Sequence, residues 1–195
     1  MMDRAVVFID GGYIDKINMN LYGYRRILLD RLSDEICKPD CARFRTYYYH
    51  CPPHQDDPPT EDQRRRKAGY DKFVGRLREK PRFMIREGRL RVVSRDPPVF
   101  EQKGVDVLFA CDLVRLAATH TVNKAIIIAG DSDFVPAVAI AKEEMVLTSL
   151  WYAPGHCSPH LWTICDERNA LTQELIDSVS EQRKPKDEKS DNQKD

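Results

Sequence analysis

Blocks of apolar residues alternate with amphipathic segments along the chain and predict an α/β fold. Residues 5–9 and 125–129 are uniformly apolar and rich in β-branched side chains, which is typical of strands buried on both faces of a parallel sheet. The same patterns predict strands at 43–49 and 146–152, and helices at about 27–36, 61–80, 103–118, 132–144 and from Ser158 onward. Because strands alternate with helices, we expect a parallel sheet with helices packed on its faces.

A hairpin and a charged tail interrupt this alternation. Phe83-Met-Ile and Leu90-Arg-Val-Val flank Glu87-Gly88, which predicts an inserted β-hairpin. Residues 179–195 are almost all charged or polar, so we expect them to form a disordered tail. Residues 1–178 would then form one domain of ordinary length.

Composition narrows the class of protein. Of the 195 residues, 42% are apolar and 32% are charged, which is too apolar for a disordered protein and too charged for a membrane protein. No apolar run approaches the roughly 18–20 residues needed to cross a bilayer, and the first strand follows the N-terminus without a signal peptide. We therefore expect a cytoplasmic protein that does not contact membranes, with its six cysteines as free thiols. The net charge of zero excludes a simple polycation that coats nucleic acid.

Three aspartates follow the two most apolar predicted strands. Asp10 comes directly after residues 5–9, and Asp131 and Asp133 come just after residues 125–129. In open α/β sheets the ligand crevice lies outside the carboxyl ends of the strands. Two separate acidic turns are therefore expected at one edge of the sheet.

A fourth aspartate, Asp106, lies in the helix predicted for residues 103–118. On a helical wheel it falls near Ala110, Leu113 and Ala117, whereas Arg115 falls on the opposite side. We therefore expect Asp106 on the face that packs against the sheet, where an unpaired carboxylate needs a proton, a basic partner or a metal ion. The alternative is an ordinary aspartate near a helix N-terminus, satisfied by backbone amides.

Carboxylates that converge on one edge repel one another unless a cation lies among them. A ligand set made of aspartate oxygens without histidine suits a hard ion such as Mg²⁺ or Mn²⁺. Phosphoryl transfer is the chemistry that uses such a site. The simpler interpretation of Asp131-Ser132-Asp133 is a helix N-cap, a common role for both residue types.

Three sequence blocks resemble the signature of the NYN domain, a group in the PIN-like superfamily of metal-dependent nucleases. The blocks are Ile9-Asp-Gly-Gly-Tyr13, Lys103-Gly-Val-Asp106 leading into Asp112-Leu113, and Gly130-Asp-Ser-Asp133 followed by Phe134-Val-Pro136. They occur in the order found in the family, and the resemblance extends over about residues 4–177.

The resemblance implies a Rossmann-like (PIN-like) parallel sheet sandwiched by helices and a site for Mg²⁺ or Mn²⁺. Asp10, Asp106 and Asp131 match the metal-binding carboxylates of the family, and Asp133 matches the accompanying acid of the third block. The implied activity is hydrolysis of RNA phosphodiester bonds by metal-activated water.

One position departs from the family pattern. Many relatives carry Asn three residues after the first Asp, whereas this chain has Tyr13, and Asn18 is a candidate to replace the missing amide. Asp112 lies about 120° around the helix from Asp106, so we interpret it as a helix-surface or salt-bridging residue.

A basic segment supplies a candidate surface for RNA. Residues 61–95 contain thirteen Lys or Arg and five acids, a local net charge of +8. Such a patch can bind the phosphates of a single-stranded RNA without reading its sequence. The candidate contacts are Arg64, Arg65, Arg66, Lys67 and Arg76. The alternative is a charged helix face that is only solvated.

Aromatic and histidine side chains leave further alternatives open. Tyr70 and Phe73 have the spacing of core residues of a helix, although either ring could stack on a base. His50-Cys-Pro-Pro-His54 and His156-Cys-Ser-Pro-His160 are two similar loops with zinc-ligand residue types but no Cys-x₂-Cys pair. His50, at the end of a predicted strand, could instead reach the substrate.

These observations predict a metal-dependent ribonuclease in which Asp10, Asp106, Asp131 and Asp133 form the catalytic site. A rival interpretation is a catalytically weak or inactive domain that binds RNA as an adaptor or regulator. A second rival is a phosphohydrolase that uses the same acids on small nucleotides. The glycine fingerprint of a dinucleotide-binding enzyme is incomplete in Asp10-Gly-Gly-Tyr13.

Overall fold

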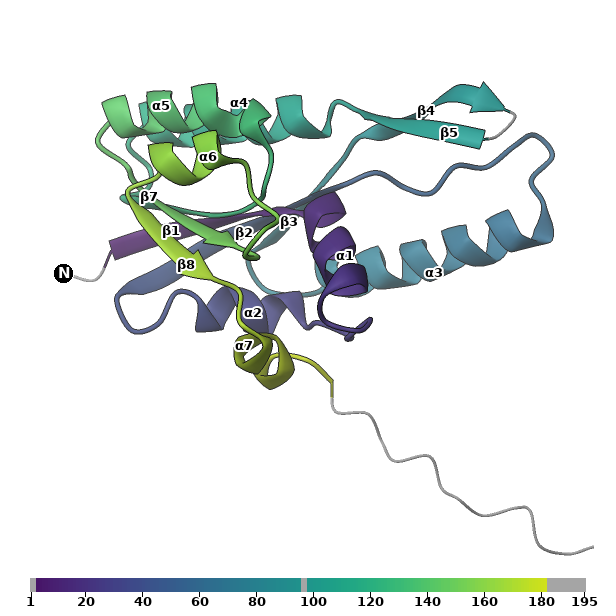
Figure 1. Ribbon diagram of the computed structural model, residues 1–195, viewed down its shortest axis with the longest axis horizontal. Coiled ribbons are helices and arrows are strands. Elements are labelled where there is room, and N and C mark those ends of the chain that lie inside the picture. Colours follow the sequence, from purple (N-terminus) through teal and green to yellow (C-terminus); the bar gives the residue numbers. More distant parts are fainter. Residues whose placement is uncertain (1–2, 96–97, 182–195) are drawn as a thin grey trace, which may run out of the picture.

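The computed structural model describes residues 3–95 and 98–181. In chain order the elements are β1 (Asp3–Asp10), α1 (Gly11–Asn20), α2 (Leu29–Glu35), β2 (Cys41–His50), α3 (Glu61–Arg78), β3 (Phe83–Glu87), β4 (Arg89–Arg95), β5 (Pro98–Lys103), α4 (Val105–Ala118), β6 (Lys124–Ile128), the 3₁₀ helix η1 (Ser132–Phe134), α5 (Val135–Glu143), β7 (Leu147–Tyr152), α6 (Pro159–Ile164), β8 (Glu167–Ala170) and α7 (Gln173–Ser178). Figure 1 shows these elements on the ribbon.

Six parallel strands form the central sheet, in the order β3-β2-β1-β6-β7-β8. The chain builds one half of the sheet outward from β1 through β2 to β3, and the other half from β6 through β7 to β8. The order therefore reverses between β1 and β6, and a crevice at the carboxyl ends of these two strands is the usual ligand site of such a sheet. The predicted Rossmann-like fold is confirmed.

Side chains of the central strands alternate between two cores. Along β1, Val6 and Phe8 join one core with α4, α5 and α6, while Val7 and Ile9 join the other with α1, α2 and α7. All four side chains are fully buried. Both faces of β1 are therefore apolar, which explains why its sequence is an uninterrupted apolar run rather than an alternating one.

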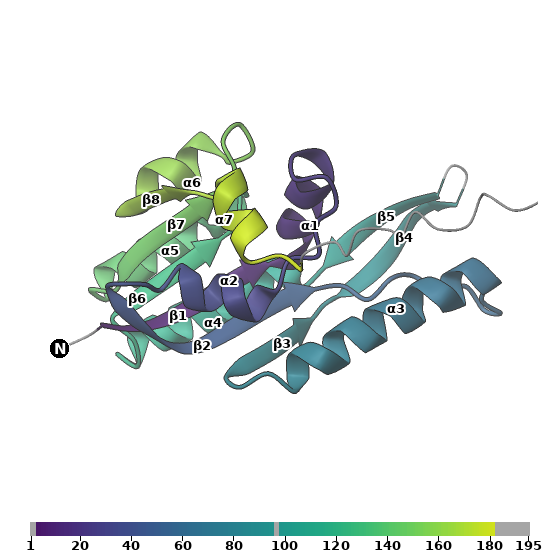
Figure 2. The ribbon, with the colours of Figure 1, turned by 90° about the horizontal axis from the view of Figure 1, so that it is seen from below.

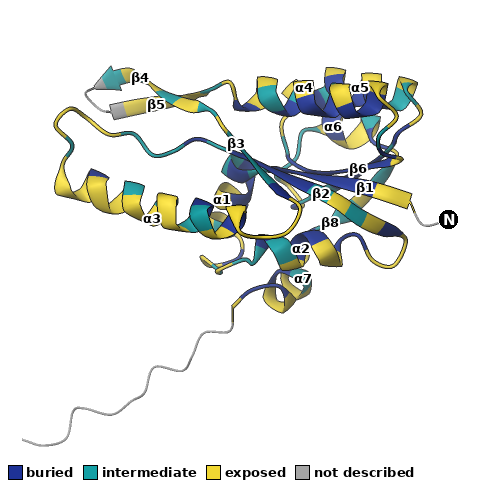
Figure 3. Cartoon of the chain, turned by 180° about the vertical axis from the view of Figure 1, so that it is seen from behind, coloured by how far each residue is buried: buried dark blue, intermediate teal, exposed yellow. Residues whose placement is uncertain are grey.

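The helix α3 and the hairpin of β4 and β5 extend away from the sheet on the side where the strands end. Figure 2 shows them side by side, with the loop between β2 and α3 running between them. Figure 3 shows that both are largely exposed, in contrast to the buried faces of α4 and α5. We call these two projections the arms of the domain.

The predicted hairpin is present but consists of different strands. Phe83–Glu87 pairs in parallel with β2 at the edge of the central sheet, whereas Arg89–Arg95 pairs with Pro98–Lys103. The glycine at position 88 separates two strands that belong to different sheets. A Cβ there would lie 2.6 Å from Val105 and 2.7 Å from the Lys103 carbonyl, so close packing requires glycine, not a hairpin turn.

Several short elements lie outside the sequence prediction, namely α1, β5, β8 and α7. In the expected tail, Val179 and Ser180 are buried against the domain, and Ser180 pairs with Ile27. The rest of the expected tail, residues 182–195, lies outside the described residues. Among residues 3–95 and 98–181, no helix has the length and apolar character to cross a membrane.

Candidate active site

Asp10 and Asp131 lie at the ends of the two neighbouring strands β1 and β6. Asp10 caps α1, and its Oδ1 accepts a hydrogen bond from the backbone N–H of Tyr13 at 3.1 Å. Asp131 caps η1, and its Oδ1 accepts a hydrogen bond from the backbone N–H of Asp133 at 3.1 Å. Both caps use Oδ1, and a further backbone hydrogen bond from Gly12 lowers the pKa of Asp10. Both are therefore helix caps and remain candidate ligands.

Glycines allow these turns to pack closely. A Cβ on Gly130 would lie 2.5 Å from the ring of Tyr13 and 2.5 Å from the carbonyl oxygen of His156. A Cβ on Gly11 would lie within 2.7 Å of the side chains of Tyr48 and His50. Such contacts are impossible for any other residue without a backbone shift, so the glycines fix how closely the turns approach.

Asp106 lies in the first turn of α4, after Gly104 turns the chain in the left-handed conformation with φ of 86°. Its side chain is exposed, so the prediction that it packs against the sheet is wrong. The buried arc of α4 is centred near Phe109 and Leu116, which places Asp106 at its margin. In the first turn this margin is open to solvent, an end effect that a helical wheel does not include.

The electrostatic coupling of the acids shows that they share one region. Burial and, to a smaller extent, the negative charge of Asp106 raise the pKa of Asp10 to about 6. The pKa of Asp106 is raised by desolvation and by the charges of Asp131 and Asp133. We call these four side chains, Asp10, Asp106, Asp131 and Asp133, the acidic edge.

No ion pair joins a lysine or arginine of the described residues to the acidic edge, and the charge of His50 offsets only a small part of the raised pKa of Asp10. None of its four carboxylates forms an ion pair anywhere in the described part of the chain. Also within the described ranges, no three His, Cys, Asp or Glu side chains are gathered closely enough to hold a metal ion as they stand. The donor chemistry nevertheless fits Mg²⁺ or Mn²⁺, because all the available ligands are carboxylate oxygens and their charges are uncompensated.

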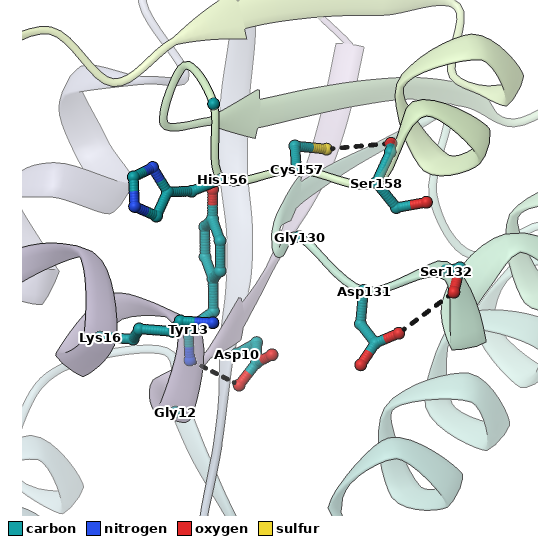
Figure 4. Close-up of a pocket in the computed structure, with 11 residues that line it drawn as sticks. Asp10, Gly12, Tyr13, Lys16, Gly130, Asp131, Ser132, His156, Cys157 and Ser158 are labelled. Atoms are coloured by element: carbon teal, nitrogen blue, oxygen red, sulfur yellow. Dashed lines mark hydrogen bonds between the residues drawn. The ribbon is translucent and has the colours of Figure 1, made fainter.

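A cleft of about 490 Å³ opens beside the acidic edge (Figure 4). Asp10 and Asp131 lie at its wall, together with Lys16 from α1 and His156 from the loop between β7 and α6. Lys16 is exposed and forms no ion pair with any described residue. The cleft is therefore lined by two carboxylates and by a lysine that has no ion-pair partner among the described residues.

Tyr13, at the position where many relatives carry Asn, joins α1 to the end of β7. Its hydroxyl accepts a hydrogen bond from the backbone N–H of Ala153 at 2.8 Å, and burial raises its pKa. Asn18 does not replace the missing amide, because its side chain bonds to both the N–H and the carbonyl of Arg25. The phenol thus holds one wall of the cleft in place, but it does not provide Asp10 with a side-chain amide.

His50 lies at the end of β2, next to the acidic edge. Its Nε2 is 2.9 Å from Oδ2 of Asp15, and its Nδ1 is 2.6 Å from the carbonyl of Cys51. Burial lowers the pKa of His50, but the Asp15 carboxylate, the Cys51 carbonyl and the charge of Asp10 outweigh it, so the pKa is raised. Both ring nitrogens are engaged within the protein. All six cysteines are free thiols, as predicted.

Asp112 forms a salt bridge, as one of the two predicted roles requires, but it is not a surface residue. It is 7% exposed and lies 2.7 Å from Nε of Arg86 and 2.9 Å from a guanidinium nitrogen of Arg115. The hydroxyl of Tyr49 also donates to it at 3.2 Å. These partners outweigh the effect of burial and lower its pKa.

The predicted RNA contacts all lie on α3, away from the acidic edge. Four of them form ion pairs with acids of the same helix: Arg64 with Glu61, Arg65 and Arg66 with Asp62, and Lys67 with Asp71. Arg76 lies at least nine residues further along the helix and lines a separate groove of about 170 Å³ between α2 and α3. The structure therefore does not gather these five cations into one patch.

Aromatic residues of α3 have mixed roles. Tyr70 is half-buried, its hydroxyl donates to Glu87 at 3.1 Å, and its ring centroid is 5.6 Å from that of His50. Phe73 meets the ring of Tyr48 edge-on at 5.8 Å. Both rings pack inward, as their spacing predicted.

Sequence reasoning missed Gln102 of β5, which reaches over the acidic edge. A Cβ on Gly12 would lie 3.1 Å from its Nε2 and 3.4 Å from Oδ1 of Asp10. No sequence signal marks this residue, because the strand that carries it was not predicted and the helix was expected to begin only at residue 103. Asp15, the partner of His50, was missed for the same reason, since α1 itself was not predicted.

Comparisons with known proteins place this site in a family. No curated protein matches the chain. The crystal structure of a protein of unknown function from Vibrio parahaemolyticus superposes with a TM-score of 0.60 and 16% identity, covering 89% of this chain and 95% of that one. At this identity it shows the shared fold alone. The model of the NYN domain matches residues 4–171, and this chain therefore belongs to the NYN domain family.

Proposed function

We propose that this NYN domain is a metal-dependent ribonuclease. NYN domains are generally nuclease-like, which supports a hydrolase acting on RNA at the level of the family. The observation that carries the proposal for this chain is the acidic edge, where charges repel one another without a basic partner. Uncompensated acids lower the stability of the fold, so their presence together at the switch point of the sheet favours a role in chemistry.

In this proposal Asp10, Asp106 and Asp131 hold Mg²⁺ or Mn²⁺ through their carboxylate oxygens. The ion, when bound, would polarise the scissile phosphate, lower the pKa of a water molecule and neutralise the charge of the leaving oxygen. Asp133 orients the attacking water, since it sits in the same turn as Asp131 and its backbone N–H holds that carboxylate in place. Lys16 binds a phosphate oxygen in the cleft.

The test is cleavage of a fluorescently labelled single-stranded RNA in Mn²⁺ and in EDTA. We expect Asp131→Asn to reduce the Mn²⁺-dependent rate by at least about 10²-fold, because a neutral amide is a weaker ligand for a hard cation. The amide oxygen still caps η1, so the thermal unfolding midpoint should stay close to that of the wild type. Asp40→Asn, which changes an exposed acid outside the site, is the matched control. Full activity of the Asp131→Asn protein would refute the assignment.

A second candidate function is RNA binding without cleavage. It is favoured by Tyr13, which stands where many relatives carry the amide of Asn. The Tyr13 hydroxyl accepts a hydrogen bond from the backbone N–H of Ala153 instead. In that case the wild-type protein binds single-stranded RNA but leaves it intact in both Mn²⁺ and EDTA. The same assay, read together with a binding measurement, separates the two functions.

A further inference from the structure

An aromatic pair links the hairpin of β4 and β5 to the loop that leads into α3. The ring of Phe100, on β5, lies 5.0 Å from the imidazole of His54, on the loop between β2 and α3, with 39° between the ring planes. Phe100 is nevertheless 44% exposed, so one part of this large apolar ring faces solvent. A phenylalanine exposed to this extent on a projecting hairpin gives the fold little burial energy.

Phe100 is aligned with the acidic edge. It lies two residues before Gln102 on β5, and the pairing with Val92 and Leu90 is regular over this stretch, so both side chains project from the same face of the strand. Gln102 reaches Gly12 and lies beside Asp10. Two residues along a strand span about 7 Å, which is close to the spacing of adjacent nucleotides in an extended single strand.

The His54 side of the pair is held in place by a chain of hydrogen bonds. His54 Nε2 lies 3.1 Å from Oδ1 of Asp56, and the other carboxylate oxygen of Asp56 accepts from Nε2 of Gln63 at 2.7 Å. Gln63 is buried at the start of α3, where it also completes a capping box with Thr60. The imidazole is therefore preorganised, and binding of a planar ligand to the pair requires little further ordering.

The surroundings of the pair are suited to a polyanion with aromatic bases. Lys67 lies four residues after Gln63, on the same face of α3, and is only partly exposed. Arg64 and Arg65 lie in the same turn as Gln63. These cations form ion pairs with acids of α3, and Val99, next to Phe100, is also exposed. A nucleic acid strand can use both parts of such a surface, since its bases stack on aromatic rings and its phosphates compete for the paired cations.

We propose that Phe100, supported by His54, is a stacking platform for an unpaired base of RNA that extends from the acidic edge between the two arms. The proposal rests on the proposed function for the identity of the polymer, but it concerns binding and not cleavage. It implies a preference for single strands, because the faces of bases in a duplex are already stacked.

The experiment measures binding by fluorescence anisotropy in EDTA, with a labelled oligouridylate as the single-stranded probe and a blunt RNA duplex as the second probe. We expect Phe100→Ala to weaken binding of oligouridylate about 5- to 150-fold, and Phe100→Trp to restore it. Val99→Ala is the matched control, because Val99 is 47% exposed on the adjacent position of the same strand. Circular dichroism reports whether each variant keeps the fold.

Each outcome decides the proposal. It is overturned if Phe100→Ala binds oligouridylate as tightly as the wild type, if Val99→Ala weakens binding equally, or if the duplex probe loses affinity to the same extent. It is also overturned if the wild type binds neither probe. Hydrolysis of bis(p-nitrophenyl) phosphate by the wild-type protein in Mn²⁺ is measured in parallel. This assay tests the proposed metal-dependent activity, so its failure is distinguished from failure of the stacking proposal.

Discussion

Two aspartates on the same helix, Asp106 and Asp112, have opposite environments. Asp106 is exposed and forms no ion pair with a described residue, and its pKa is raised by partial desolvation and by the charges of Asp131 and Asp133. Asp112 is buried, is paired with Arg86 and Arg115, and has a lowered pKa. The folded state is thus organised to neutralise one charge and to leave the other uncompensated.

This difference separates a structural carboxylate from the carboxylates that we propose to be functional. A buried acid is tolerated only with hydrogen bonds and opposite charges, and Asp112 has both. The acidic edge has a partial set of backbone hydrogen bonds and no cation, so its acids are poised to bind a positive ligand. Burial alone does not distinguish the two classes, whereas the presence or absence of a basic partner does.

The largest effect on stability is expected at Asp112. Asp112→Ala should lower the free energy of unfolding by about 3–5 kcal/mol at neutral pH, because it leaves Arg86 without its buried partner. Since the folded pKa of Asp112 is depressed, its contribution is present above the unfolded pKa of about 4 and is lost as the pH falls through the folded value. The difference between variant and wild type should therefore shrink in acid, as measured by urea unfolding at neutral pH and below pH about 4.

The matched control for this prediction is Asp106→Ala on the same helix. It removes a charge that has no cation partner in the described residues, so the free energy of unfolding should change by less than about 0.5 kcal/mol or rise. Equal destabilisation by the two substitutions would show that the contrast between these aspartates is wrong.

The sequence predicted the positions of these acids along the chain better than their environments. Asp10 and Asp131 were located because they follow strands that are apolar on both faces, and such strands identify the centre of a parallel sheet. The salt bridges of Asp112 were among its predicted roles, but the burial of Asp106 and Asp112 was expected the other way round. A helical wheel treats every turn alike, whereas Asp106 lies in the exposed first turn and Asp112 faces arginines from two different elements.

Long-range contacts explain the remaining errors. The side chain of Arg86 reaches Asp112 because β3 joins the central sheet, and nothing in Phe83–Glu87 distinguishes a sheet edge from one strand of a hairpin. Gln102 approaches Gly12 only because β5 turns back along β4. These pairings depend on which strands meet in space, which local apolar patterns do not encode.

A smaller effect, of opposite sign, is expected at Asp10. In EDTA above pH about 6, Asp10→Asn should raise the free energy of unfolding by about 1–2 kcal/mol, because it removes a charge that burial disfavours while the amide oxygen still caps α1. The folded pKa is raised from 3.8 to about 6, so the penalty for the ionised form is absent below the unfolded value and grows as the pH rises through this window. Urea unfolding of both proteins below pH 3.8 and above pH about 6 measures this difference in free energy of unfolding.

Divalent metal provides the control for this prediction. Mn²⁺ should raise the unfolding midpoint of the wild type more than that of Asp10→Asn, because binding to the native state stabilises it and the variant has lost a charged ligand. A variant that is less stable than the wild type at high pH in EDTA would show that the ionised Asp10 carboxylate does not destabilise the fold. A metal-induced shift of equal size in both proteins would show that Asp10 is not a ligand.

The smallest effect is expected for charges that are paired but exposed, of which Arg65 is an example. Its side chain is 79% exposed and lies 2.5 Å from Asp62 one turn away, so Arg65→Ala should change stability by less than about 0.5 kcal/mol. If Arg65 contacts a phosphate, the substitution should reduce the slope of log affinity against log salt by about 1, with oligouridylate as the probe. Arg76→Ala, which removes a cation from the separate groove between α2 and α3, should leave that slope unchanged. Equal slopes for both variants would mean that the exposed pairs on α3 are only solvated, and that RNA affinity arises at the cleft and at the hairpin of β4 and β5.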